Sequence, residues 1–357
     1  MLIKNIGYWT REDKLLRNNY FDISNNKIDL DQNIIQNWLA PFGLECKEKN
    51  ISINNLNLIQ NISDIDLLIV SDFPGKKNQS SLLKKGMRCK RKILIIEENP
   101  TVYPETWNNL IHDIFDYVLT MWDDKIDNKK YFKYNFPCIS MHENLFTLDK
   151  KINFTDKKFS CMISWNKIYR KESNTPFKIN IIKWFENNHP DQFDLYGPNW
   201  DEKVFSYRNP ITKYFNESYF KILRKFLGKH YPSWKGSVDA ENKKKLINKY
   251  KFIFILENSS EYNGYITDKI FETFLSGSVP VYFGAENINK YIPESCFINI
   301  RNFKDLNNLY SFLNSINEEN YNLFLKNIND YLNSDKSKIF KTEHLNKTLF
   351  KVIDLYN

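Results

Sequence analysis

Cysteine is scarce in this chain, and its positions are irregular. Among 357 residues there are only five cysteines, and none of them forms a Cys-x-x-Cys pair. Disulfide frameworks and zinc sites both need paired or clustered cysteines, so the pattern argues against both. A free cysteine in an apolar run usually behaves as a small buried hydrophobic residue. We expect this of several members of the set Cys46, Cys89, Cys138, Cys161 and Cys296.

Long hydrophobic runs are also missing. No stretch approaches the roughly 18 consecutive apolar residues that a membrane-spanning helix needs. The N-terminal residues lack the apolar core of a signal peptide and look like the start of a strand. We therefore expect no transmembrane segment and a reducing, cytoplasmic location, with peripheral membrane contact left open.

Positive charge is in excess but is not concentrated. The chain has 51 Lys and Arg against 43 Asp and Glu, a net charge of +8. The basic residues occur in short, dispersed runs such as 243–245, and these are typical of solvated surfaces. Neither a basic arm nor a basic helix stands out, so we expect no nucleic-acid partner. An anionic small substrate remains compatible with the charge.

Short apolar segments alternate with helical patterns along most of the chain. Such alternation predicts parallel sheets covered on both faces, and the length suggests two domains. The expected strands are 2–8, 67–70, 93–96, 117–122, 159–164, 193–196, 252–256, 279–283 and 297–300. The expected helices are 34–39, 179–186, 268–276, 304–313 and 321–332. The fold class predicted is therefore α/β.

The most informative segment runs from residue 250 to residue 300. It reads as an apolar strand, a polar loop, a helix start at YITDK and a second apolar strand. This arrangement commonly holds a phosphate at a helix N-terminus, although the chain has no GxGxxG or GxxxxGK[ST] loop. Thr267 is suited to cap the helix through its hydroxyl. Lys269 lies in the first turn, where a cation is unfavourable unless an anion is nearby. A solvated lysine near a helix start is the simpler alternative.

The same segment resembles glycosyltransferase family 10, the α-1,3/4-fucosyltransferases. The matching letters are YKF, ENS, YITDK and GSVPVYFG, followed by IP and FI. The resemblance implies a GT-B fold, with two Rossmann-like domains facing a central cleft. It also implies transfer of L-fucose from GDP-fucose to a glycan hydroxyl with inversion, most simply as an α-1,3 linkage. We expect an N-terminal, acceptor-binding domain over 1–153, a GDP-fucose-binding domain over 154–335 and a helical tail over 336–357 that packs back on the N-terminal domain.

The resemblance also implies which residues contact the donor. Tyr265 would contact the nucleotide and Asp268 a ribose hydroxyl, although the family usually has glutamate at the latter position. The diphosphate would be held by Arg170 or by Lys178. These are not equivalent, because a guanidinium can bind a phosphate through two hydrogen bonds and an ammonium makes a single contact. The full expected donor set is Ser164, Asn166, Arg170, Lys178, Glu257, Asn258, Tyr265, Ile266, Thr267, Asp268 and Lys269. For Glu257, the alternative is a strand-end carboxylate satisfied by a backbone N–H.

A general base is expected at the end of the strand at 93–96. Ligands bind at the carboxyl ends of strands in open α/β sheets, and Glu97, Glu98, Asn99 and Pro100 follow this strand. The sequence is similar to the Glu-Ser-Pro motif of the family, so Glu98 is the candidate base, with Glu97 as its neighbour. An acidic turn before proline is the alternative. His112 and His142 sit in no recognisable motif, and we interpret them as ordinary residues.

Metal dependence separates this prediction from the other large glycosyltransferase class. Acidic pairs such as Asp29/Asp31, Asp64/Asp66 and Asp123/Asp124 occur, but pairs of this kind arise readily by chance. Basic residues and a helix start are able to neutralise a leaving diphosphate, so we expect no essential metal and no cofactor besides the donor.

Other interpretations stay open at this stage. The chain is also compatible with a GT-B transferase that uses another nucleotide sugar, or with a two-lobed binding protein that has no turnover. The aromatic stretch 200–234 suits either a packed insertion or an acceptor platform.

Overall fold

The computed structural model describes residues 3–11, 21, 39–74, 81–138, 152–167, 173–205, 214–216, 218–228 and 231–356. The chain divides into two compact units. Unit 1 comprises residues 1–143, 262–266 and 338–357, and unit 2 comprises 144–261 and 267–337. The C-terminal tail and a five-residue piece of the 250–300 segment therefore lie in unit 1. The predicted boundaries, after residues 153 and 335, stay predictions.

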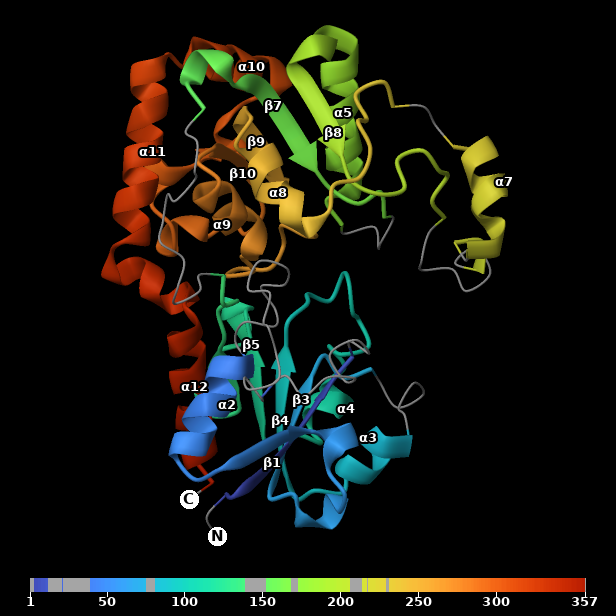
Figure 1. Cartoon of the computed structure of the whole chain (residues 1–357), viewed down its shortest axis with the longest axis vertical. Coiled ribbons are helices and arrows are strands. Elements are labelled where there is room, and N and C mark those ends of the chain that lie inside the picture. The colour runs from blue at the N-terminus through green and yellow to red at the C-terminus, as the bar shows by residue number, and fades with distance from the viewer. Residues whose placement is uncertain are drawn as a thin grey trace. The chain divides into compact units, whose positions relative to one another are not determined.

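Unit 1 is built on a six-stranded parallel sheet (Figure 1). Its strands lie in the order β2-β1-β3-β4-β5-β6. Their bounds are Asn5–Thr10 (β1), Ser52–Asn55 (β2), Leu67–Ser71 (β3), Arg91–Ile96 (β4), Tyr117–Thr120 (β5) and Tyr131–Lys133 (β6). Every residue of β3 is buried, as expected for a central strand with both faces covered.

Four helices accompany the sheet in the described part of unit 1. They are α2 (Leu39–Glu48), α3 (Ser81–Gly86), α4 (Asn109–His112) and α12 (Thr342–Asp354). Helix α12 packs against α2, with ring centroids of Phe42 and Phe350 5.1 Å apart. Sequence analysis placed a helix at 34–39, of which 34–38 lie outside the described residues. Helix α2 was missed because it contains Pro41 and Gly43, two residues that usually interrupt helices. A side chain at Gly43 would meet Phe21 at 3.0 Å.

Unit 2 contains a five-stranded parallel sheet in the order β11-β10-β9-β7-β8. Its strands are β7 (Lys158–Ile163), β8 (Phe193–Tyr196), β9 (Tyr250–Leu256), β10 (Val279–Phe283) and β11 (Ile298–Asn299). Its helices are α5 (Thr175–Asn188), α7 (Lys221–Phe226), α8 (Ala240–Ile247), α9 (Asp268–Leu275), α10 (Leu306–Ser315) and α11 (Glu318–Leu332). A continuous core of apolar and aromatic side chains joins α5, α10 and α11 to the sheet.

The two strands that sequence analysis missed, β2 and β6, are the edges of the sheet in unit 1. Their sequences, SINN and YFK, lack the apolar runs of the central strands. An edge strand is covered less than a central one and is held largely by backbone hydrogen bonds, which do not depend on side-chain identity. The central strands β3, β4, β5, β9 and β10 all lie where the apolar runs predicted them.

Candidate functional site

In unit 2, a buried carboxylate stands at the end of the central strand β9. The side chain of Glu257 has no exposed surface. Its oxygens accept hydrogen bonds from the backbone N–H of Thr267 at 2.9 Å and from the Thr267 hydroxyl at 2.9 Å. The Lys269 ammonium lies 2.7 Å from the same carboxylate. Glu257 is therefore held by a backbone N–H, as the simpler alternative proposed, and also by a cation.

The N-terminus of α9 lacks the capping hydrogen bond that the sequence predicted. Thr267 is the N-cap residue, but its side chain makes no capping hydrogen bond. Its hydroxyl donates to Glu257, and its oxygen accepts from the Lys269 ammonium at 2.9 Å in place of a first-turn N–H. The predicted capping bond is thus wrong. The sequence also predicted an anion near Lys269. Within unit 2, this anion is the Glu257 carboxylate.

A second helix start in unit 2 is attached to the same strand end. The Asn174 side chain, just before α5, donates to the Glu257 carbonyl at 2.9 Å, and the Asn174 backbone N–H donates to the Asn258 carbonyl at 3.1 Å. The loop after β9 therefore fixes the first turns of both α5 and α9. Helix N-termini carry partial positive charge and attract anions.

Lysines accumulate around these two helix starts. Lys178 lies on α5, and burial together with the ammonium groups of Lys269 and Lys167 lowers the pKa of Lys178 to about 8. Its ammonium approaches the Trp165 carbonyl at 3.5 Å. The two neighbouring ammonium groups disfavour the charged form of Lys178, and a bound anion would relieve this repulsion. This arrangement suits a diphosphate.

The expected donor residues after β7 have structural partners. The Asn166 side chain donates to the Asn199 carbonyl at 2.8 Å, and the Ser164 carbonyl accepts from the Trp200 indole at 2.7 Å. Gly197 has φ +118°, and a Cβ there would lie 2.1 Å from the Ser164 oxygen. Only glycine fits this approach. Arg170 lies outside the described residues, so the structure describes only one of the two candidates for the diphosphate, Lys178.

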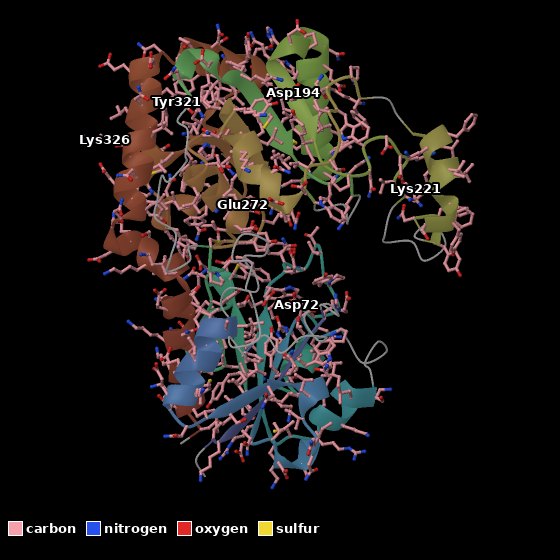
Figure 2. The ribbon with its side chains drawn as sticks, in the orientation of Figure 1. Asp72, Asp194, Lys221, Glu272, Tyr321 and Lys326 are labelled. Carbon is pink, nitrogen blue, oxygen red and sulfur yellow. The ribbon has the colours of Figure 1, made fainter. Side chains whose placement is uncertain are left out.

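In unit 1, carboxylates gather at the ends of β3 and β4. Glu97 accepts a hydrogen bond from the Ser71 hydroxyl at 2.7 Å, and its backbone N–H donates to Asp72 at 3.0 Å. Burial, and then the nearby Glu97 and Glu98 carboxylates, raise the pKa of Asp72 well above its usual value. Asp72, marked in Figure 2, also has a left-handed φ of +49°. Sequence analysis did not place Asp72 in the site, although its position directly after a buried strand was a signal.

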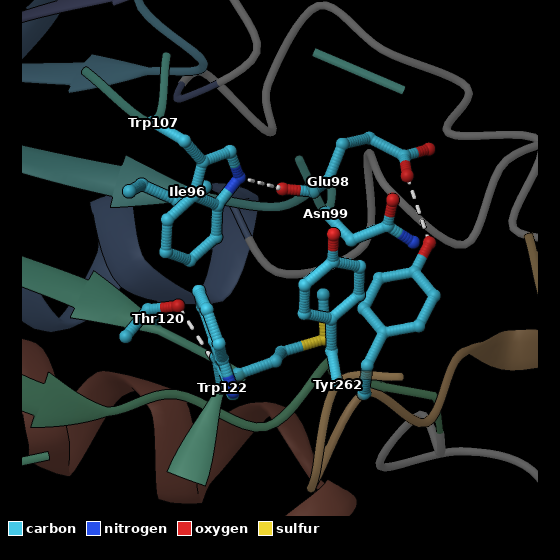
Figure 3. A pocket seen from close by; sticks show the side chains of 9 residues that line it. Ile96, Glu98, Asn99, Trp107, Thr120, Trp122 and Tyr262 are labelled. Atoms are coloured by element: carbon cyan, nitrogen blue, oxygen red, sulfur yellow. Dashed lines mark hydrogen bonds between the residues drawn. The ribbon is translucent and has the colours of Figure 1, made fainter. Parts of the chain in front are cut away.

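Glu98 lines a small pocket within unit 1 (Figure 3). The Tyr265 hydroxyl donates to its carboxylate at 2.8 Å, and the Trp107 indole donates to its carbonyl at 2.9 Å. The space inside the pocket, adjoining solvent included, is about 190 Å³. Its other lining residues are Ile96, Asn99, Thr120, Met121, Trp122 and Tyr262. A half-buried carboxylate beside aromatic rings suits a base that accepts a proton from a carbohydrate hydroxyl.

The remaining expected donor residues fall in both units. Tyr265 and Ile266 are 2% and 1% exposed and belong to unit 1. Asp268, the first residue of α9, and Asn258 are half-buried in unit 2. Roles in donor binding for these four residues stay predictions. The hydrogen bond between Tyr265 and Glu98 was not foreseen.

His112 has structural partners, in line with its interpretation as an ordinary residue. It is buried, its Nδ1 lies 3.0 Å from the Tyr131 hydroxyl and its Nε2 lies 2.8 Å from the Thr106 carbonyl. Burial lowers its pKa. His142 lies outside the described residues.

The acidic pairs also have local structural roles where they are described. The Asp66 carboxylate accepts from the backbone N–H groups of Lys4 and Asn5 at 2.9 Å, and Asp123 pairs with Lys133 at 2.6 Å. Asp29 and Asp31 lie outside the described residues. Over the described part of the chain, no group of three or more His, Cys, Asp or Glu side chains is arranged to hold a metal ion.

The aromatic stretch contains both packed and exposed rings. Trp200 is fully buried against Tyr231, whereas Tyr214 and Tyr219 are more than 60% exposed. A buried ion pair of Arg224 and Glu202, 2.7 Å apart, ties α7 to the residues before it. None of the helices in the described ranges is long and apolar enough to cross a membrane.

Comparisons with known proteins agree with this geometry. Residues 205–349 match the model of the glycosyltransferase family 10 (fucosyltransferase) C-terminal region, which confirms the resemblance found in the sequence. An α-(1,3)-fucosyltransferase FucT of Helicobacter pylori is 29% identical over 75 residues, 21% of this chain and 16% of that relative. The 4-galactosyl-N-acetylglucosaminide 3-α-L-fucosyltransferase 9 of Mus musculus is 34% identical over 111 residues, 30% of each chain. The chain thus matches less than a third of either relative.

A solved structure extends the likeness to the fold of nearly the whole chain. A crystal structure of an α1,3-fucosyltransferase superimposes with a TM-score of 0.56 and 13% identity, over 99% of this chain and 91% of that one. The predicted GT-B fold class, α/β with two Rossmann-like domains, is confirmed.

Proposed function

We propose that this chain is an inverting glycosyltransferase that moves L-fucose from GDP-fucose to a glycan hydroxyl, forming an α-1,3 linkage. One observation carries the proposal. The region that matches the fucosyltransferase family contains the start of α9, where Lys269 and Thr267 surround the buried Glu257. The names of both relatives support fucose as the transferred sugar and the 3-position as its destination.

Unit 2 supplies the positive charge that a leaving diphosphate needs. Two helix starts and the ammonium groups of Lys178 and Lys269 favour GDP as it departs. The C–O bond between the anomeric carbon and the diphosphate breaks as the acceptor oxygen attacks that carbon from the opposite side. GDP leaves with the electron pair of the broken bond, and inversion follows from this single displacement.

Unit 1 supplies the base in this proposal. The Glu98 carboxylate takes the proton of the attacking hydroxyl, so that the acceptor oxygen becomes the new glycosidic oxygen. Glu97 is occupied by Ser71 and lies beside Asp72. We therefore assign the base role to Glu98 and a supporting role to Glu97.

Two properties of the protein follow as further proposals. The cationic helix starts support transfer without an essential metal. All five cysteines are free, and burial raises the thiol pKa of Cys46 to about 12 and that of Cys296 to about 11. Such thiols are unreactive, which supports work in a reducing compartment such as the cytoplasm.

The deciding experiment measures GDP released from GDP-fucose with and without N-acetyllactosamine, the acceptor suggested by the name of the mouse relative. Release that requires the acceptor, with a fucosylated product, supports the proposal. UDP-glucose and UDP-galactose are tested alongside, and turnover with either of them but not with GDP-fucose would identify a different donor. Tight binding of GDP-fucose without release under any condition would indicate a binding protein.

A further inference from the structure

We propose that Tyr265 is a positioning residue for Glu98: its hydroxyl holds and orients the carboxylate that accepts the acceptor proton. This inference rests on the proposed function, because it takes Glu98 as the base. It assigns Tyr265 a task in unit 1, in place of the nucleotide contact that the resemblance implies.

The contact is direct and its donor is well fixed. The Tyr265 hydroxyl lies 2.8 Å from Glu98 Oε2, and the Tyr265 side chain is only 2% exposed. A buried ring has few alternative positions, so the position of its hydroxyl oxygen is set by packing. Glu98 Oε2 is thereby engaged, which restricts the orientations open to the carboxylate.

The short segment that carries Tyr265 is anchored in unit 1 at three other places. The Asn263 carbonyl accepts from the backbone N–H of Asp123 at 2.9 Å, and its side chain donates to Asp124 at 3.2 Å. The Tyr262 ring packs edge to face on Trp122, with centroids 4.9 Å apart.

Gly264 shows how closely this segment is fitted. It has φ +78°, and a Cβ there would lie 2.5 Å from both Asp123 Oδ1 and Lys133 Nζ. The Lys133 ammonium bridges the Asp123 carboxylate at 2.6 Å and approaches the Gly264 carbonyl at 3.4 Å. Residues 262–266 therefore form a rigid support for the Tyr265 ring, as a positioning residue requires.

A neutral hydroxyl is a suitable partner for a general base. It favours the ionised carboxylate, which is the form able to accept a proton, but adds no opposing charge that would hold it ionised throughout the reaction. Removing the hydroxyl removes this hydrogen bond, so the carboxylate ionises at higher pH and is held less firmly in its orientation. Both effects reduce turnover and leave the donor contacts of unit 2 unchanged.

The test compares wild-type protein with Tyr265→Phe. We expect the acid limb of the kcat/KM profile for N-acetyllactosamine to move up by roughly one pH unit, and kcat to fall about 10-fold, as for the loss of one hydrogen bond to a charged group. The GDP dissociation constant, measured by calorimetry, should not change. Tyr117→Phe is the control, because Tyr117 packs on Phe132 and Tyr356 in unit 1 and is not among the pocket residues; it should leave the profile in place. In a Glu98→Gln background, Tyr265→Phe should cause no further loss.

A raised GDP dissociation constant with an unmoved acid limb would overturn the inference and restore the nucleotide contact. If Tyr265→Phe does not fold, Tyr265→His retains a ring with an N–H donor; it should keep donor affinity and most of kcat, and loss of donor affinity would count equally against the inference. Failure of the proposed function looks different, because the wild-type protein would then release no GDP from GDP-fucose.

Discussion

Two glutamates lie close to the ends of central strands, one in each unit, but have different partners. Glu98 lies two residues beyond β4 and Glu257 directly follows β9, each at the carboxyl end of a central parallel strand. Glu98 is half-buried and receives a neutral tyrosine hydroxyl. Glu257 is fully buried and receives an ammonium, a hydroxyl and a backbone N–H.

The difference separates a carboxylate that can work as a base from one that organises its surroundings. Both carboxylate oxygens of Glu257 accept hydrogen bonds from the protein itself, one from the Thr267 backbone N–H and the other from the Lys269 ammonium. Strand position alone therefore does not assign a catalytic role. The partner that reaches the strand end assigns it.

The strongest way to break this comparison is to remove proton acceptance at Glu98. Glu98→Gln keeps the shape and the hydrogen bond from Tyr265, so we expect turnover to fall about 10²–10⁴-fold while GDP-fucose still binds. Steady-state kcat and calorimetric donor binding provide the measurement. Glu97→Gln is the matched control and should be milder. Full activity of Glu98→Gln, with loss in Glu97→Gln, would move the base by one residue.

Removing Lys269 tests the other half of the comparison. Lys269→Ala should raise the GDP-fucose dissociation constant about 10- to 100-fold, through loss of a charge-assisted phosphate contact. It should also lower the free energy of unfolding by about 2 kcal/mol. This is less than the 3–5 kcal/mol of a fully buried pair, because the Lys269 side chain is 32% exposed.

Lys243 of α8 provides a matched control for Lys269 in unit 2. Lys243 pairs with Glu272 and is 30% exposed, so Lys243→Ala should destabilise the protein by a similar amount without changing donor affinity. Urea unfolding and calorimetry separate the two effects. Equal donor affinity in Lys269→Ala and wild-type protein would remove Lys269 from the diphosphate site.

The pH dependence of donor binding tests whether Lys178 contacts the diphosphate. Its pKa is lowered to about 8 by burial and by neighbouring ammonium groups, and a bound diphosphate would favour the charged form. Binding then takes up a proton above pH 8, so the GDP dissociation constant should rise up to about 10-fold between pH 7 and pH 9. Lys178→Arg, which stays charged, should bind with a flatter profile. A pH-independent dissociation constant in the wild-type protein would contradict this.

The smallest expected effect is that of chelation. If helix starts and lysines stabilise the leaving diphosphate, GDP-fucose turnover should be unchanged in excess EDTA. The assay is initial-rate GDP release before and after dialysis against the chelator. Loss of activity that Mn²⁺ or Mg²⁺ restores would show that the cations of unit 2 are insufficient.

Much of the fold was predictable because its signals are local. The central strands are continuous apolar runs, and the segment 250–283 contains strand, loop, helix start and strand within a short length of chain. The pair of Glu257 and Lys269 spans only twelve residues. Lys269 was named as a site residue from its position in the first helical turn, and Glu257 from the family resemblance. The edge strands β2 and β6 were not predicted, because they are stabilised by backbone pairing with a neighbouring strand and have no apolar pattern.

The sequence by itself determined the α/β class, and it predicted a phosphate-binding segment and a candidate base, since each depends on residues close together in the chain. Tertiary structure alone decided the partners. Tyr265 and Glu98 are 167 residues apart, and the Thr267 hydroxyl donates to Glu257 and accepts from Lys269, where the sequence predicted a helix cap. Side-chain pairing over such distances depends on the path of the folded chain, which no local periodicity encodes.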